Sequence, residues 1–217
     1  PSLTFSTTVA PLVQSDLVPY FIDIDINTLQ IDTTLLARMD ISNVSAICVP
    51  NLIGNIANWQ EIHKFAKENN LLVIEDSADT IGYDYPNMVE DWSDVATTSF
   101  YASHVITGAG FGGMTCFKDE SFFLKAKSLR GWGRRSSLYG ETEDYERRFN
   151  CEIDGIDYDD KYVFDDLGYN FLPSEISAAF ALVQLDQLDK NINNRSDNFD
   201  YLRDAISQSR NMRTFET

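Results

Sequence analysis

The sequence predicts an α/β fold, a three-layer sandwich built around a mainly parallel sheet. Along the first half of the chain, apolar runs typical of buried strands alternate with amphipathic stretches typical of helices. The chain has 217 residues, 43% of them hydrophobic, which is enough for one substantial core or part of a larger one. Polar residues follow several strand-like runs, and ligands collect at the carboxyl ends of parallel strands. We therefore expect a ligand site at that edge of the sheet.

Strand and helix signals follow one another in order from the N-terminus. Helical spacing predicts a short helix over 32–39 and an amphipathic helix over 59–68, whose Ile62, Phe65 and Ala66 face inward. Apolar runs predict strands over residues 18–24, 45–49, 71–74, 95–101 and 113–117.

The character of the chain changes after about residue 120. Residues 122–129 have a helical pattern, whereas 131–160 are rich in charge, Gly, Ser and Tyr with weak periodicity. A loop of that length is usually functional or part of an interface. Two helices are expected from Pro173 onward, the second over about 196–209. We divide the chain into part of an α/β domain at 1–130, an irregular excursion at 131–166, and a helical segment at 167–217.

Composition narrows the class of protein. The net charge of −17 argues against nucleic acid or an anionic membrane as a partner. Cys48, Cys116 and Cys151 are odd in number, far apart and without a CxxC pair, so they signal neither a disulfide framework nor a metal site. A reducing cytoplasm is the expected compartment. The chain opens at Pro1 without an initiator Met, and we expect it to be a fragment of a longer protein.

The first stretch that could carry chemistry is VIEDSADTIG, residues 73–82, where a strand delivers Asp76 to its end and Asp79 follows. A buried carboxylate at a strand terminus needs a cation or a strong donor. The protonated nitrogen of a pyridine ring is one such partner. A helix cap or turn aspartate explains the same stretch, because aspartate favours those positions.

The second stretch is SFYASHVITGAGFGG, residues 99–113, which contains Ser99, His104 and a run of glycines. Hydroxyls and backbone N–H groups in a glycine-rich loop suit a phosphate, although the run is not a Walker loop and a simple turn also explains it. His104 is one of only two histidines, and imidazole suits acid–base work. The third stretch, LGYNFLPSEISAAFALVQLDQL, places Asn170 in a turn before an amphipathic helix.

Together these stretches resemble the DegT-type sugar aminotransferases, which are pyridoxal phosphate enzymes with the aspartate aminotransferase fold. VPYFIDIDINTLQID and PNLIGN resemble a strand and a loop near the substrate. PSLTFSTTVAP resembles the segment whose aromatic residue stacks on the cofactor, here Phe5. By the same resemblance, Asp76 binds the pyridinium nitrogen and Ser99 the phosphate, which Asn170 reaches from a partner subunit. The resemblance implies that residues 1–130 are part of the cofactor-binding large domain of a fold type I enzyme and that 167–217 lead to a small domain missing from this chain. It also implies a homodimer with a shared active site.

Two positions depart from the aminotransferase pattern. His104 stands where those enzymes carry the lysine that holds the cofactor covalently, and no lysine lies between Lys67 and Lys118. Asp79 stands where they usually have glutamine. Both residues resemble the NDP-4-keto-6-deoxyhexose 3-dehydratase branch of the family, and this resemblance implies that Asp79 is a further cofactor-binding residue. One dehydratase type binds an iron–sulfur cluster through four cysteines, but only Cys151 lies in the corresponding region here, so the cluster-free type is expected.

The resemblance implies a function for the intact parent protein: pyridoxamine phosphate-dependent 3-dehydration of an NDP-4-keto-6-deoxyhexose in deoxysugar and lipopolysaccharide (O-antigen) biosynthesis. His104 is the expected acid–base residue, and the substrate is a nucleotide sugar whose nucleotide these residues do not specify. Two alternatives stay open. One is a sugar-nucleotide aminotransferase of the DegT type, and the other is a catalytically inactive member retained for dimerisation or regulation.

Overall fold

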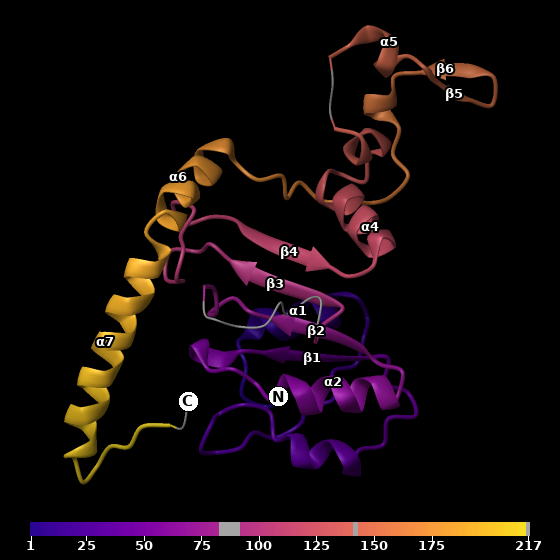
Figure 1. The fold of residues 1–217 in the computed structure, drawn as a ribbon. Coiled ribbons are helices and arrows are strands. Elements are labelled where there is room, and N and C mark those ends of the chain that lie inside the picture. The colour runs from indigo at the N-terminus through magenta and orange to yellow at the C-terminus, as the bar shows by residue number, and fades with distance from the viewer. Residues whose placement is uncertain (83–91, 141–142, 216–217) are drawn as a thin grey trace. The chain divides into compact units, whose positions relative to one another are not determined.

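The computed structural model describes residues 1–82, 92–140 and 143–215, and the chain divides into two compact units (Figure 1). Unit 1 comprises Pro1–Lys118 with Glu175–Thr217, and unit 2 comprises Asp119–Ser174. The irregular excursion predicted at 131–166 lies inside unit 2.

Unit 1 is built on a four-stranded sheet in the order β1-β2-β3-β4 (Figure 1). β1 pairs in parallel with β2, β2 in parallel with β3, and β3 antiparallel with β4. This arrangement confirms the predicted α/β fold with a mainly parallel sheet. The strands are β1 (Ala46–Pro50), β2 (Leu72–Asp76), β3 (Val95–Ser99) and β4 (Gly113–Phe117).

Helix α2 (Trp59–Glu68) supplies one side of the core of unit 1. Its first turn is capped by the Asn58 side chain, which accepts a hydrogen bond from the Glu61 N–H. Apolar residues recur at helical spacing, so Ile62 and its neighbours face the sheet as predicted. The buried cluster joins this helix to β1, β2 and the segment before them through Ile31, Leu36, Ile47, Val49, Ala57, Trp59, Ile62, Ala66 and Val73.

The remaining elements are mostly short. Unit 1 also contains α1 (Ser6–Gln14), η1 (Thr33–Arg38), η2 (Leu52–Gly54), α6 (Glu175–Leu185) and α7 (Leu188–Ser207). Unit 2 contains α4 (Glu120–Arg130), η3 (Arg135–Leu138), α5 (Tyr145–Arg148), β5 (Cys151–Ile153), β6 (Ile156–Tyr158) and η4 (Asp160–Tyr162). In the part of the chain that the structure describes, no helix combines the length and apolar character needed to cross a bilayer.

The strand predicted over 18–24 is wrong. This segment is irregular apart from an isolated bridge between Ile24 and Ile31, and Val18 is 93% exposed. An apolar run becomes a strand only where another strand accepts its backbone hydrogen bonds, and none runs alongside it in the described chain. The sequence reading also missed α1, which holds Pro11 inside the helix, and the β5–β6 hairpin.

Candidate functional site

Asp76 lies at the carboxyl end of β2 and is held from two sides. The Thr8 hydroxyl on α1 donates to Asp76 Oδ2 at 2.7 Å, and the Ala78 N–H donates to Asp76 Oδ1 at 3.2 Å. A carboxylate offers about four lone-pair positions, so Asp76 keeps capacity for a further donor. The carboxylate is only partly buried, which leaves it open to a ligand.

Asp79, three residues beyond Asp76, forms a hydrogen-bonded pair with His104. Asp79 Oδ1 lies 3.0 Å from His104 Nδ1, and Asp79 Oδ2 accepts the Ile53 N–H at 3.1 Å. The side chain of His104 is 17% exposed, and that of Asp79 is 40% exposed. An ionised carboxylate only accepts hydrogen bonds, so Nδ1 carries the hydrogen and Nε2 is left as the basic nitrogen of the ring. The geometry therefore suits His104 Nε2 for taking up and returning a proton.

The backbone around Ile53 is strained. Ile53 adopts the left-handed conformation, with φ 52° and ψ 28°, which a β-branched residue rarely adopts. This conformation directs its N–H to the Asp79 carboxylate. Backbone strain of this kind gathers at functional sites, where the surroundings enforce it. Sequence reasoning placed this loop near a substrate through PNLIGN but did not single out Ile53.

A buried polar network lies directly behind these residues. Glu75 is fully buried; it accepts hydrogen bonds from Asn51 Nδ2 at 2.9 Å, Ser77 Oγ at 2.5 Å and Ser93 Oγ at 3.2 Å. Burial raises the pKa of Glu75, and the three donors oppose that rise. The Asn51 N–H also donates to the carbonyl of Asp76, so the network ties the carboxyl end of β1 to that of β2. Sequence reasoning missed Asn51 and Glu75, because only the strand register brings them together.

Ser99 ends β3, and the glycine-rich run forms the loop between β3 and β4. Ser99 Oγ accepts the Tyr101 N–H at 3.2 Å, so its own hydroxyl hydrogen is available to a phosphate oxygen. Gly110 and Gly112 have φ of +92° and +100°. A side chain on Gly108 would lie 2.3 Å from the Phe111 carbonyl. These glycines are therefore explained by the shape of the turn.

The other two predicted residues belong to different elements. Phe5 occupies the N-cap position of α1, one turn before Thr8, and the residue is 68% exposed. Asn170 is exposed and lies in unit 2, where its backbone bridges to Gly131. The structure therefore gathers Asp76, Asp79, Ser99 and His104 on the sheet edge and adjoining loops of unit 1, and Phe5 lies on the first turn of α1 in the same unit.

This donor set fits the pyridoxamine phosphate that the resemblance implies. Asp76 has an acceptor position for a protonated ring nitrogen, Ser99 has a hydroxyl for a phosphate, and Phe5 offers an exposed aromatic face. The sequence holds no lysine between Lys67 and Lys118, so the usual position lacks an amine that could bind the cofactor covalently. Among the residues described, no three His, Cys, Asp or Glu side chains converge as a metal site.

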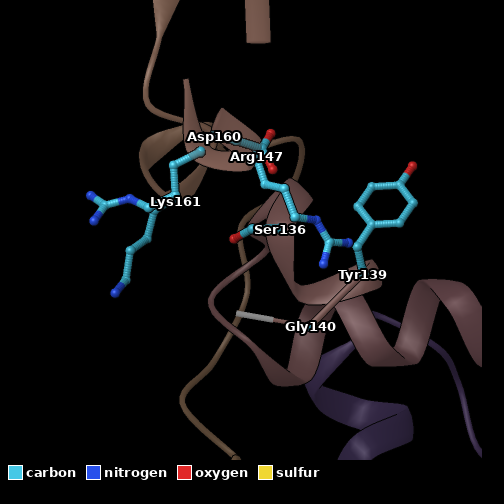
Figure 2. Close-up of a pocket in the computed structure, with 7 residues that line it drawn as sticks. Ser136, Tyr139, Gly140, Arg147, Asp160 and Lys161 are labelled. Atoms are coloured by element: carbon cyan, nitrogen blue, oxygen red, sulfur yellow. The ribbon is translucent and has the colours of Figure 1, made fainter. Parts of the chain in front are cut away.

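Unit 2 has a cavity of its own, with a volume of about 110 Å³ (Figure 2). Arg148 at this cavity forms ion pairs with Glu143 (2.8 Å) and with Asp159. None of the predicted site residues lines it. Its lining consists of Ser136, Tyr139, Gly140, Arg147, Arg148, Asp160 and Lys161.

Comparison with known families and curated proteins gives a consistent set of relatives. The model of the DegT/DnrJ/EryC1/StrS aminotransferase family matches residues 1–217. The lipopolysaccharide biosynthesis protein RfbH of Salmonella typhimurium is 34% identical over 206 residues, which are 93% of this chain and 47% of that protein. The GDP-4-keto-6-deoxy-D-mannose 3-dehydratase of Escherichia coli O55:H7 is 31% identical over 212 residues, which are 95% of this chain and 52% of that protein. The chain thus spans about half the length of these relatives.

Solved structures agree with the sequence relatives. The E. coli GDP-4-keto-6-deoxy-D-mannose-3-dehydratase with bound hydrated PLP matches with a TM-score of 0.79 and 28% identity, over 100% of this chain and 56% of that one. The Psychrobacter cryohalolentis aminotransferase matches with a TM-score of 0.68 and 23% identity, over 86% of this chain and 45% of that one. The second likeness shows a shared fold alone.

Proposed function

Because this chain belongs to the DegT/DnrJ/EryC1/StrS aminotransferase family, we propose that the protein containing it catalyses the pyridoxamine phosphate-dependent 3-dehydration of an NDP-4-keto-6-deoxyhexose. One observation carries the proposal. At the position where the resemblance implies the cofactor lysine of the aminotransferases, the chain has His104, hydrogen-bonded to Asp79. A histidine keeps a base at this place but removes the amine, which favours elimination over transamination. The relatives named 3-dehydratase support the same assignment.

Four residues of this chain are proposed to hold the cofactor. Phe5 packs against its ring, Asp76 accepts the ring N–H, and Ser99 donates its hydroxyl to the phosphate. Asn170 reaches the phosphate from the partner subunit. Pyridoxamine phosphate, when bound, supplies an amine for the keto group of the sugar and a ring that accepts electrons.

Asp79 and His104 are proposed to handle the proton. Asp79 holds Nδ1–H, and this fixes the ring orientation and leaves Nε2 as the base. With pyridoxamine phosphate bound, His104 Nε2 would accept a proton from its aminomethyl carbon and would then donate that proton to the hydroxyl group that leaves carbon 3 of the sugar. One residue can act as both base and acid because the base is needed first and the acid only afterwards. The buried Glu75 network behind Asp76 keeps this edge of the sheet in place.

The proposal includes a cytoplasmic homodimer acting on a nucleotide sugar in deoxysugar and lipopolysaccharide biosynthesis. Exposed apolar side chains on α6 support the dimer, since Ile176 is 79% exposed and Leu182 63%. Three free cysteines support a reducing compartment. Light scattering after size-exclusion chromatography tests the dimer, and a mass equal to one subunit contradicts it.

The test of the function is a product assay with pyridoxamine phosphate and a panel of GDP-, CDP- and dTDP-4-keto-6-deoxyhexoses. We expect a 3-deoxy product from one of them by NMR, and a 4-amino sugar product would favour an aminotransferase instead. His104→Lys should lower dehydration by about 100-fold or more. His63→Asn is the matched control, because His63 contacts the Trp92 carbonyl (3.0 Å) and has no proposed role. Undiminished dehydration by His104→Lys contradicts the role given to His104.

A further inference from the structure

The contact between Thr8 and Asp76 joins α1 to β2 across 68 residues of sequence. A helical threonine commonly satisfies its hydroxyl on a backbone carbonyl within its own helix. Thr8 instead donates to Asp76 Oδ2 at 2.7 Å, the usual length of a hydrogen bond from a hydroxyl to an oxygen. The neighbouring Thr7 is exposed, whereas Thr8 is partly buried. Thr8 is therefore the threonine of α1 that is aimed at the sheet edge.

From this contact we infer that Thr8 is a positioning residue, whose hydroxyl fixes the Asp76 carboxylate in the orientation that receives the cofactor's ring nitrogen. The role of this orientation in receiving a ring nitrogen rests on the proposed function. The hydroxyl and the Ala78 N–H each take a different carboxylate oxygen, so together they oppose rotation of the group. A carboxylate fixed in this way presents its remaining lone pairs in one direction.

Helix α1 also links the two proposed contacts on the cofactor ring. The Thr8 N–H donates to the Phe5 carbonyl at 3.1 Å, so Phe5 and Thr8 belong to the same turn. Phe5 is the proposed stacking residue, and Thr8 holds the carboxylate that meets the edge of the same ring. A displacement of Thr8 therefore changes both the stacking face and the edge contact. Removal of the hydroxyl alone leaves Phe5 in place and isolates the effect on Asp76.

The experiment compares Thr8→Val, Thr8→Ser and Thr7→Val with the wild-type protein. Valine keeps the shape of threonine without the hydroxyl, serine restores the hydroxyl, and Thr7 provides the same substitution at an exposed position on the same helix. The first readout is the NMR shift of the ring nitrogen in ¹⁵N-labelled pyridoxamine phosphate, together with its dissociation constant. We expect Thr8→Val to move the ¹⁵N shift and weaken binding by about tenfold, the cost of one charge-assisted hydrogen bond. Thr8→Ser and Thr7→Val should match the wild type.

The second readout needs no cofactor: the ¹³C resonance of the Asp76 carboxyl carbon in the free protein. A change confined to Thr8→Val supports the positioning role. Identical ¹³C and ¹⁵N signals in Thr8→Val and Thr7→Val overturn it. Failure of the wild-type protein to bind pyridoxamine phosphate overturns the proposed function, and the carboxyl resonance then still decides whether Thr8 orients Asp76. If Thr8→Val does not fold, Thr8→Ala replaces it and is judged by the same two signals.

Discussion

Replacement of Asn51 by alanine tests the buried network behind the site. All four hydrogen-bonding positions of the Asn51 amide are used: Nδ2 donates to Glu75 and Ser77, and Oδ1 accepts from the Ala57 N–H at 3.0 Å and Trp59 Nε1 at 2.9 Å. Asn51→Ala leaves two buried donors, on Ala57 and Trp59, without their acceptor, whereas Glu75 Oε1 keeps Ser77. Each orphaned buried group costs about 1–3 kcal/mol, so the two sum to about 2–6 kcal/mol.

Water entering the vacated space recovers part of this cost, and we expect the free energy of unfolding to fall by about 3–4 kcal/mol. Urea denaturation followed by tryptophan fluorescence measures the loss and reports on Trp59, which is 3% exposed. Asn27→Ala is the control, because Asn27 is an exposed asparagine in a turn. If Asn51→Ala costs no more than Asn27→Ala, the reasoning that this network holds the sheet edge together is refuted.

Two further predictions concern Glu75 and Gly133. Burial raises the pKa of Glu75 above its ordinary 4.5, so the stability from its protonated form is fully present below that pH and is lost as the pH rises through the folded pKa. Glu75→Gln mimics the protonated form and should gain stability relative to the wild type as the pH rises above 4.5, as measured by urea denaturation; a difference that does not vary with pH contradicts this. Gly133 has φ +75°, and a Cβ there would lie 2.1 Å from the Asp166 carbonyl, whereas Gly155 has φ +79° and open space. Gly155→Ala should cost about 1–2 kcal/mol and Gly133→Ala clearly more in thermal unfolding, and equal losses would show that the close approach is unimportant.

The core of the fold could be predicted from the sequence where two signals agreed. Residues 59–68 combine helical spacing with an asparagine cap, and the observed α2 has the same bounds. The prediction of a strand over 18–24 was wrong because alternating apolar residues indicate that one face of a segment is buried. They do not show that another strand lies alongside to pair with it. The β5–β6 hairpin was missed although Asp154 and Gly155 both have positive φ, as a two-residue hairpin turn requires. The Asp-Gly dipeptide typical of such turns was present in the sequence. It was overlooked because the residues around it are charged and show little periodicity.

The candidate site could be predicted only in part. The sequence predicts Asp76 at the end of a strand but runs the next strand to residue 101, whereas the observed β3 ends at Ser99. The parallel pairing of β2 and β3 then sets Asp76 and Ser99 at one edge of the sheet. The contact between Asp79 and His104 spans 25 residues and depends on the path of the loop after β3, so spacing cannot reveal it. The partnership of Asn51 with Glu75 depends on strand register in the same way. Ile53 was missed because its contribution comes from the backbone, which residue type does not report.

That backbone contribution has a consequence for how the loop can evolve. Asp79 is held by the Ile53 amide, and every amino acid except proline supplies that N–H. Many substitutions at position 53 should therefore keep the hydrogen bond to Asp79. Glycine and asparagine would be the least strained of them in this backbone conformation. Because the Ile53 side chain is 67% exposed, such drift would alter the surface of this loop without disturbing the pair behind it. Substitutions at this position are thus expected to change the side chain on the surface and to leave the Asp79–His104 pair unchanged.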